Sequence, residues 1–357
     1  MNNRVDRLRP LLFENNIDAI FITQQENRRY LSGFTGSAGS LFISQEKSIL
    51  ATDFRYVEQA KTEAPGFEVV QISNGISKWF PDLIAELAVQ RIGFEETAVS
   101  YATYIELTSS LRERKENISL IPCKRVVESL RAIKDEEELN YIEKAATIAD
   151  AALEEILPSV EPGISEQELA WRLETRMRQN GSEVMPFQII VASGTNAALP
   201  HAKPSMKKII EGEPIVIDFG ARVNGYSSDT TRTICLGKGD TTFNRIYDIV
   251  LGAQLTAIET AQAGMTGEQI DTLARTVIEQ AGHGNNFGHG LGHGVGLAAH
   301  EEPRIGPGSK DIIIDGMVFT IEPGIYIAGW GGIRIEDTIA LRENSFNILT
   351  KTRKTWR

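Results

Sequence analysis

Apolar and polar residues alternate with two periods along the first part of the chain, one typical of strands and the other of helices. Short strands are predicted for four β-branched or aromatic runs: 19–23, 40–43, 48–52 and 91–94. A helical period covers 100–115, and the turn-rich stretch GFTGSAGS separates the first two strands. This alternation predicts a small α/β domain.

The helical period becomes dominant after a break in the pattern near residues 124–134. Apolar positions then recur at helical spacing throughout 134–157, which predicts one long helix. A chain of 357 residues is also too long for a single compact core. We therefore divide it into an N-terminal domain, 1–125, and a second domain, 126–357.

An internal repeat is visible within the second domain. The stretch 162–169 resembles 263–270 at an offset of 101 residues, and Ser165 or Thr266 stands ahead of a helical pattern in each copy. Each copy follows another helical stretch and precedes strands punctuated by glycine. The second domain is therefore predicted to consist of two similar halves, each built as helix, helix and sheet.

Two acidic residues fall on one predicted hairpin in the first half. Asn224 and Gly225 form the tip of a type I′ turn between two apolar, β-branched runs. Counting back from this tip makes Asp218 and Asp229 diagonal neighbours on one face, where Cβ atoms lie roughly 7–8 Å apart. Two carboxylates at that separation can bracket a metal ion.

A second predicted hairpin carries two more acids in the other half. Its strands, 319–323 and 332–337, are linked by the glycine-rich stretch YIAGWGG, which would turn the chain near Gly329. Glu322 and Glu336 then lie across from each other on paired strands.

The four acids would converge if the two hairpins faced each other. Each acid interrupts an apolar or β-branched strand, so a solvated strand face explains them poorly. Two unit charges 4 Å apart repel by about 4 kcal/mol at an effective dielectric of 20, and a cluster of four needs cations to neutralise it. The sequence therefore predicts a metal site.

Three of the five histidines lie in the stretch HGLGHGVGLAAH, at positions 289, 293 and 300. His289 and His293 have the i, i+4 spacing of helical zinc proteases, but the glycines at every second position from 288 to 296 make a helix improbable. Nor does a strand–turn–helix unit surround them, as a phosphate-binding loop requires. We expect one histidine to bind the metal beside the acids and another to serve the substrate.

Charge and composition exclude several other functions. The formal charge of −11 argues against a nucleic-acid or anionic-membrane surface. The two cysteines form no disulfide framework, the N-terminus lacks a signal peptide, and no apolar run is long enough to span a membrane. We expect a cytoplasmic protein.

These residues together resemble the metallopeptidases of the pita-bread fold. The resemblance rests on SDTTRT, GHGVG, IEPGIY and RIED, which contain Asp229, His293, Glu322 and Glu336, together with Asp218. RYLSGFTGS and TDFRY resemble the creatinase-type domain that precedes the catalytic domain of Xaa-Pro peptidases such as aminopeptidase P and proline dipeptidase. The resemblance implies an α/β creatinase-like domain followed by an α+β pita-bread catalytic domain with two pseudo-symmetric halves.

The resemblance also implies a metal set and a reaction. Two divalent ions, manganese, cobalt or zinc, would be held by five residues: Asp218, Asp229, His293, Glu322 and Glu336. A water shared by the ions would lose a proton to Glu322, and the hydroxide would attack the bond between an N-terminal residue and a proline.

Further site residues follow from the same resemblance. His201, in NAALPHAKPS, and His300, in AAHEEP, match substrate-facing histidines. His289, Tyr326 and Arg334 would lie around the substrate or behind the metal ligands, whereas His283 matches nothing and is expected in a surface loop. The family commonly forms homodimers.

Three alternatives exist within this family: dipeptidase in place of aminopeptidase P, a relative without catalysis, and methionine aminopeptidase. The five metal ligands do not separate a dipeptidase from aminopeptidase P. A peptide-binding relative without catalysis would have lost ligands that this chain retains, and methionine aminopeptidase does not need the N-terminal domain.

Overall fold

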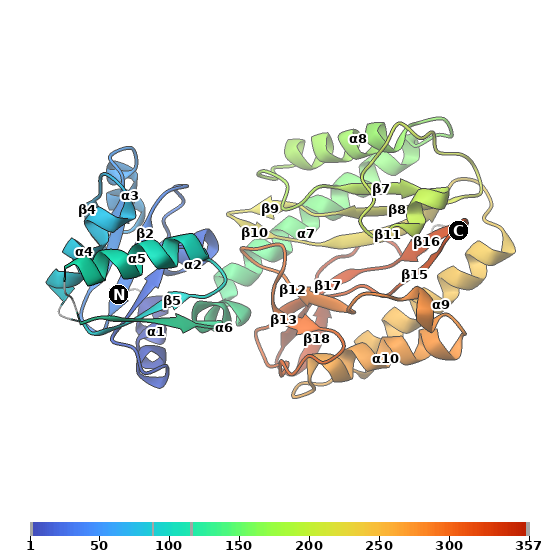
Figure 1. Cartoon of the computed structure of the whole chain (residues 1–357). Coiled ribbons are helices and arrows are strands. Elements are labelled where there is room, and N and C mark those ends of the chain that lie inside the picture. Colours follow the sequence, from blue (N-terminus) through green and yellow to red (C-terminus); the bar gives the residue numbers. More distant parts are fainter. Residues whose placement is uncertain (1–2, 88, 115–116, 355–357) are drawn as a thin grey trace. The chain divides into compact units, whose positions relative to one another are not determined.

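The computed structural model describes residues 3–87, 89–114 and 117–354, and the chain divides into two compact units (Figure 1). The first unit is Met1–Arg131 and the second is Ala132–Arg357. In the described residues, no helix is long and apolar enough to cross a membrane.

A six-stranded mixed sheet, in the order β4-β3-β2-β1-β5-β6, forms the centre of the first unit. Apolar faces of α4 and α5 pack against it, for example through Phe80 and Leu107 against Phe21 and Phe42. The predicted α/β domain is therefore confirmed. Its helices are α1 (Asn3–Glu14), α2 (Gln25–Ser32), α3 (Val57–Glu63), α4 (Ile76–Leu87), α5 (Tyr101–Glu113) and α6 (Val126–Ala132), and its strands are β1 (Ala19–Ile22), β2 (Ser40–Ser44), β3 (Ser48–Thr52), β4 (Glu68–Gln71), β5 (Arg91–Glu95) and β6 (Ser119–Cys123).

The sequence predicted the inner strands of this sheet but missed both edge strands. β4 and β6 pair with a neighbour on one side only, and most of their side chains are partly or fully exposed. An edge strand with polar residues has no apolar run to reveal it, because the hydrophobic pattern records burial and not hydrogen bonding.

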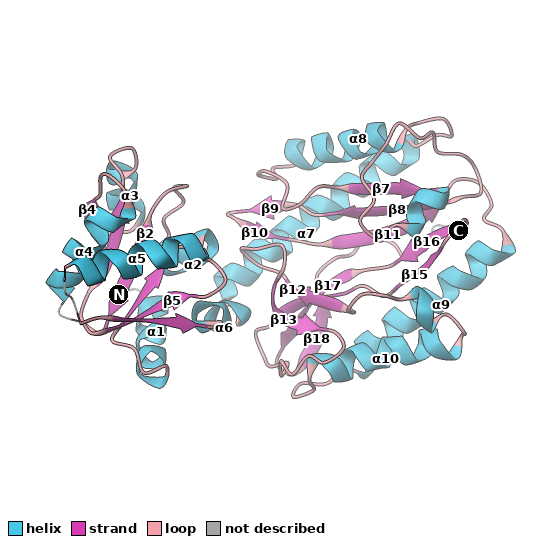
Figure 2. Ribbon diagram, in the orientation of Figure 1, coloured by secondary structure: helices cyan, strands magenta, loops and turns pink. Residues whose placement is uncertain are grey.

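The second unit places its strands between two pairs of helices (Figure 2). Helices α7 and α8 pack on one sheet, and α9 and α10 pack on another. The helices are α7 (Glu136–Ile156), α8 (Glu166–Gln179), α9 (Thr241–Thr260) and α10 (Gly267–Gln280), with short 3₁₀ turns η1 (Leu157–Ser159), η2 (Gly194–Ala198) and η3 (Gly284–Asn286). The strands are β7 (Ile190–Ser193), β8 (Pro214–Phe219), β9 (Arg222–Val223), β10 (Tyr226–Ser227), β11 (Thr230–Cys235), β12 (Gly292–Gly294), β13 (Glu301–Ile305), β14 (Val318–Ile321), β15 (Gly324–Ile327), β16 (Gly331–Arg334), β17 (Asp337–Arg342) and β18 (Ser345–Ile348).

The predicted long helix is confirmed as α7. Its N-terminus is fixed by a capping box in which Asp135 accepts a bond from the backbone of Glu138, and the Glu138 side chain accepts one from the backbone of Asp135. Small side chains at Ala145, Ala149 and Ala152 follow the helical period and are fully buried. This stripe lets α8 and the first sheet approach α7 closely.

The predicted internal repeat is also confirmed. Ser165 caps α8 and forms a backbone bridge to Lys208, while Thr266 caps α10 and forms the equivalent bridge to Ile312. In the first half α8 lies on the sheet β11-β8-β7, and in the second half α10 packs near β13 of the sheet β13-β12-β14-β17-β18. The two halves therefore share one plan of helix, helix and sheet.

Candidate metal centre

The first hairpin has the register that its turn predicts. Val223 pairs with Tyr226, and the same register continues into β8 and β11, where Asp218 lies opposite Thr231. Asn224 and Gly225 at the tip both have positive φ angles, of 46° and 80°, as a type I′ turn needs.

Asp229 lies at a break in this hairpin, just before β11 begins. Because one register runs through both sides of the break, Asp229 is the diagonal neighbour of Asp218, as expected. The predicted first pair of carboxylates is therefore confirmed in position, on one face of the hairpin.

The second hairpin repeats this arrangement. Ile321 pairs with Asp337 in the ladder β14/β17, and Gly324 pairs with Arg334 in the ladder β15/β16. The one register that joins both ladders puts Glu322 across from Glu336, in the gap between them. The predicted second pair is confirmed. Asp229, Glu322 and Glu336 lie where a long hairpin is interrupted, whereas Asp218 lies within β8, opposite Thr231.

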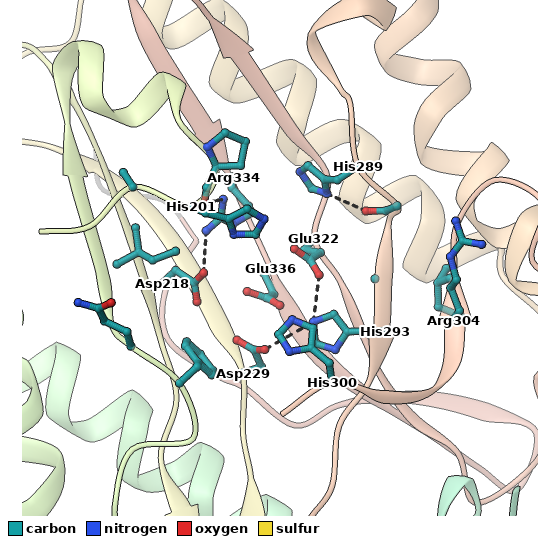
Figure 3. Close-up of a pocket in the computed structure, with 18 of the residues that line it drawn as sticks. His201, Asp218, Asp229, His289, His293, His300, Arg304, Glu322, Arg334 and Glu336 are labelled. Atoms are coloured by element: carbon teal, nitrogen blue, oxygen red, sulfur yellow. Dashed lines mark hydrogen bonds and ion pairs between the residues drawn. The ribbon is translucent and has the colours of Figure 1, made fainter. Parts of the chain in front are cut away.

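A cavity of about 580 Å³ lies between the two halves of the second unit. Figure 3 shows acids from both hairpins pointing toward its centre, with histidines around them. The cavity brings together nearly all of the site residues expected from the sequence: His201, Asp218, Asp229, His289, His293, His300, Glu322, Arg334 and Glu336. Tyr326 does not line it but contacts two residues that do.

His293 presents one ring nitrogen to the acids. Its Nδ1 donates to the carbonyl of Gly294 at 3.0 Å, so Nε2 carries the lone pair and lies 3.4 Å from Glu322 Oε1 and 3.7 Å from Asp229 Oδ2. Burial lowers the pKa of His293, which keeps the imidazole neutral. The lone pair of Nε2 therefore faces two carboxylates, with no proton of its own to donate to them.

The backbone on either side of His293 leaves no room for side chains. A Cβ at Gly292 would come within 2.0 Å of the Thr320 carbonyl oxygen, and one at Gly294 would come equally close to that of Glu302. The glycines of this stretch therefore allow β12 to lie tightly against its neighbours and to hold His293 at the floor of the cavity.

The acids at this site are charged groups that the protein only partly compensates. Burial, followed by repulsion from neighbouring acids, raises the pKa of Asp229 and Glu336 well above the ordinary values, and burial raises that of Glu322 to about 7. One oxygen of Asp218, Oδ1, is buried without a hydrogen-bond partner. Such a set is costly by itself and is stabilised by cations.

The donor atoms suit divalent metal ions. Single ligand atoms of Asp229, His293 and Glu336 all lie within 4.8 Å of one another, and Asp218 and Glu322 line the same cavity. Carboxylates with one imidazole form a hard donor set that accepts several divalent metals. The residues therefore fit the metal centre that the sequence predicts.

A chain of hydrogen bonds leads from Asp218 through Arg334 and Tyr326 to His289. Arg334 donates to Asp218 Oδ2 at 2.7 Å and to the hydroxyl of Tyr326 at 2.9 Å, and that hydroxyl lies 3.0 Å from His289 Nε2. His289 Nδ1 donates to the carbonyl of Gly290, so Nε2 accepts the hydroxyl proton of Tyr326. Burial lowers the pKa of His289 to about 4. All three side chains are therefore engaged with the protein.

The two remaining cavity histidines differ from His289. His300 lies over the ring of His293, with ring centres 4.0 Å apart, and His201 lies on the loop after η2. Both side chains are exposed to the cavity, and no hydrogen bond to either ring is seen among the described residues. His283 lies in the loop before η3, outside the cavity, and its ring contacts Asn286 at 3.4 Å.

Two cations of the cavity wall were missed by the sequence reasoning. Lys203 and Arg304 both line the cavity and are exposed. Arg304 lies opposite His293 in the pairing of β12 with β13, a relation that only the strand register reveals. Lys203, two residues after His201, could have been found by its place in the same loop.

Comparisons with known proteins bear on the whole chain. Residues 140–343 match the model of metallopeptidase family M24, and residues 4–133 match the creatinase/prolidase N-terminal domain. An Xaa-Pro dipeptidase of Pyrococcus furiosus is 39% identical over 357 residues, which cover 99% of both chains.

Solved structures are similar over the same extent. An Xaa-Pro dipeptidase from Bacillus anthracis is 42% identical, with a TM-score of 0.94 over 99% of this chain and 98% of that one. An X-Pro aminopeptidase from Thermotoga maritima is 37% identical, with a TM-score of 0.88 over 99% of both chains. Relatives with both kinds of name therefore share this fold.

Proposed function

Since the chain belongs to metallopeptidase family M24 and carries a creatinase/prolidase N-terminal domain, we propose that it hydrolyses the bond between an N-terminal residue and a proline. One observation carries the proposal: a neutral imidazole and buried, partly uncompensated acids face one another across the cavity. The Xaa-Pro specificity is supported by relatives named Xaa-Pro dipeptidase and X-Pro aminopeptidase.

The metal centre in this proposal is dinuclear. Two divalent ions, manganese by preference or cobalt or zinc, would be held by five residues: Asp218, Asp229, His293, Glu322 and Glu336. When bound, such ions supply the acidification of water that attack on an amide requires.

Glu322 is the proton carrier of the proposed reaction. Its carboxylate lies in the cavity, and the hydroxyl of Thr320 donates to Oε1 at 3.1 Å, which fixes its orientation. Glu322 would take a proton from the attacking water and pass it to the leaving proline nitrogen. This nitrogen needs the proton because an amide anion is too basic to leave unprotonated.

His201 and His300 would bind the reacting part of the substrate. Their rings are exposed to the cavity from two different loops, so their N–H groups are available to an oxyanion or a peptide carbonyl. His289, Tyr326 and Arg334 would not contact the reacting atoms in this scheme. They would orient Asp218, since their hydrogen bonds join them to one another and to that residue.

The rest of the cavity suits a short peptide with a proline ring. Phe187, Ile190 and Ile305 give it an apolar side, whereas Lys203 and Arg304 give it two exposed cations that suit a peptide carboxylate. A site that binds the ring and the free ends does not depend on the amide N–H that proline lacks.

The test compares Ala-Pro, Ala-Pro-Ala and Ala-Ala-Ala at equal concentration with manganese present. We expect the proline peptides to be cleaved faster, and preference for Ala-Ala-Ala would refute the proline assignment. Cleavage of Ala-Pro alone would identify a dipeptidase, and rapid cleavage of Ala-Pro-Ala an aminopeptidase.

The proposal includes a cytoplasmic location, expected from the lack of a disulfide framework, and a homodimer, expected from the family resemblance. Light scattering of the purified protein measures its mass in solution. A monomer at micromolar concentration would remove the dimer from the proposal without affecting the chemistry.

A further inference from the structure

A fully buried carboxylate, Glu166, begins helix α8 outside the cavity. It is the first residue after the cap Ser165, where the helix dipole favours a negative charge. Metal ligation does not explain it, because Glu166 does not line the cavity. Its partners are instead residues of the loop that carries His201.

Glu166 accepts hydrogen bonds from both ends of this loop. Oε1 accepts from the backbone and hydroxyl of Ser193, at 2.7 and 2.8 Å, and Oε2 accepts from those of Ser205, at 3.1 and 2.6 Å. The amide of Asn196 donates to both oxygens at 3.1 Å. One carboxylate thus joins the two ends of the segment 193–205.

The first turn of α8 reinforces this attachment. The backbone N–H of Glu166 donates to the carbonyl of Lys207 at 3.1 Å, and that of Gln167 donates to the carbonyl of Ser205 at 3.0 Å. Between the attached ends the chain passes through η2 and then brings Pro200, His201, Ala202 and Lys203 to the cavity wall.

His201 itself has little to hold it. Its ring is exposed, and among the described residues no hydrogen bond to that ring is found. Its place in the cavity is therefore set by the path of its loop, which Glu166 holds at both ends and which Arg334 contacts at the carbonyl of Pro200, at 3.2 Å. We propose that Glu166 is a positioning residue that holds His201 at the substrate, an inference that rests on the proposed role of His201.

The negative charge of Glu166 is essential to this role. A carboxylate offers two acceptor oxygens, one for each end of the loop, and bonds to an ionised acceptor are the stronger kind. Glutamine has nearly the same shape, but its amide nitrogen would replace one of the two acceptor oxygens. Two N–H donors would then face each other at either Ser193 or Ser205, and no hydrogen bond could form there. Glu166→Gln should therefore release one end of the loop while leaving the metal ligands in place.

A purely structural role predicts a different result, so the test needs a readout specific to His201. Glu168→Gln is the matched control, since Glu168 is in the same helix turn, about half exposed and paired only with Arg172 in the described structure. Both substitutions are made in the metal-loaded full chain, with His201 present and with His201→Ala.

The kinetic arm measures kcat and KM on the preferred proline peptide. Glu166→Gln should lower kcat about tenfold to a hundredfold, the cost of misplacing a group by about 1 Å, with metal content unchanged. In the His201→Ala background, Glu166→Gln should lower kcat by less than about twofold. Equal losses in both backgrounds would overturn the proposal, and Glu168→Gln should leave kcat as it is.

The second arm does not depend on any reaction. The chain has five histidines, so their ring C–H signals can be separated by NMR in the zinc-loaded protein, where no paramagnetic ion broadens them, and the His201 signal identified by its loss in His201→Ala. The His201 signal should shift or broaden in Glu166→Gln and stay in place in Glu168→Gln. An unchanged signal in Glu166→Gln would contradict the proposal, whereas a wild-type chain inactive on Xaa-Pro peptides would refute only the proposed function.

Ser205→Ala covers the case in which Glu166→Gln fails to fold. It removes the hydroxyl bond to Oε2 and keeps the backbone bond, so the loop is loosened and not released. A smaller shift of the same His201 signal is expected, and its absence would overturn the proposal.

Discussion

Two neighbouring buried acids of the second domain, Glu336 and Asp337, lie in opposite electrostatic environments. Both are almost completely buried, yet burial, followed by repulsion from neighbouring acids, raises the pKa of Glu336, whereas the pKa of Asp337 is lowered. Burial would raise the pKa of Asp337 too, but Arg232 and Lys354 outweigh it. Four side chains bond to Asp337: Arg232, Lys354, Gln254 and Thr350.

The difference separates a structural acid from a functional one. Asp337 and Arg232 form an ion pair with both side chains wholly buried, and the protein itself balances the charge. Glu336 accepts a bond from the hydroxyl of Thr231, but its charged neighbours are mainly acids. A buried carboxylate alone therefore does not mark a site; the missing counter-charge does.

Of the changes that test this difference, removal of metal should have the largest effect on activity and stability. We expect a chelator to abolish peptidase activity and to lower the melting temperature, and added divalent metal to restore both, because ligand binding stabilises the folded state. Activity assays with elemental analysis measure this. Full activity in protein shown to be free of metal would refute the metal centre.

Two matched substitutions should separate the structural acid from the metal-binding acids, one by its effect on stability and the other by its effect on metal binding. Asp337→Asn leaves Arg232 buried with less compensation and should lower the unfolding free energy by about 3–5 kcal/mol. Asp229→Asn should instead abolish metal binding and turnover, without destabilising the metal-free protein, because it removes a like charge. Urea unfolding and metal analysis compare the two, and an Asp229→Asn variant with normal metal content and turnover would contradict this assignment.

The histidines should show a smaller and more selective effect. His201→Ala and His300→Ala should each lower turnover by about 10²–10³-fold with metal content unchanged, the usual cost of a lost oxyanion donor. His283→Ala, outside the cavity, should do almost nothing. If His283→Ala proved as harmful as His300→Ala, the sorting of the histidines would be wrong.

The smallest effect concerns the pH dependence of metal-free stability. A carboxyl group with a higher pKa in the folded than in the unfolded protein binds more protons when folded, so stability falls as pH rises between the two values. The pKa of Glu322 is raised from 4.5 to about 7, and those of Asp229 and Glu336 shift in the same direction.

The lowered pKa values of His289 and His293 act in the opposite sense, but only below their ordinary value of 6.5. Between pH 6.5 and 8.5 we therefore expect the unfolding free energy of the metal-free protein to fall by about 1–3 kcal/mol. Bound metal or Glu322→Gln should reduce this slope. A metal-free protein whose stability rises over that range would contradict the account of the acid cluster.

Local patterns of the sequence predicted much of this site. The Asn224-Gly225 turn fixes the register that brings Asp218 beside Asp229, and a turn is a local property. The long helix and the paired caps Ser165 and Thr266 were readable for the same reason.

The missing parts depend on residues far apart in the chain. Asp337 looks like its neighbour Glu336 in the motif RIED, and only folding reveals Arg232, 105 residues earlier, as its partner. The bonds of Glu166 to Ser193 and Ser205 span 27 and 39 residues, and Arg304 reaches the cavity through strand pairing. Sequence patterns reveal which residues are buried more readily than which residues meet.

The interrupted hairpins have a mechanical consequence. Asp218 and Asp229 belong to the first half of the repeat, whereas His293, Glu322 and Glu336 belong to the second. An ion held by both sets is a cross-link between two structural copies, across a seam that also carries hydrogen bonds, among them those between Thr233 of β11 and Arg334 of β16. The backbone amides along that seam should therefore exchange with deuterium as one cooperative unit, slowly with metal and faster without it.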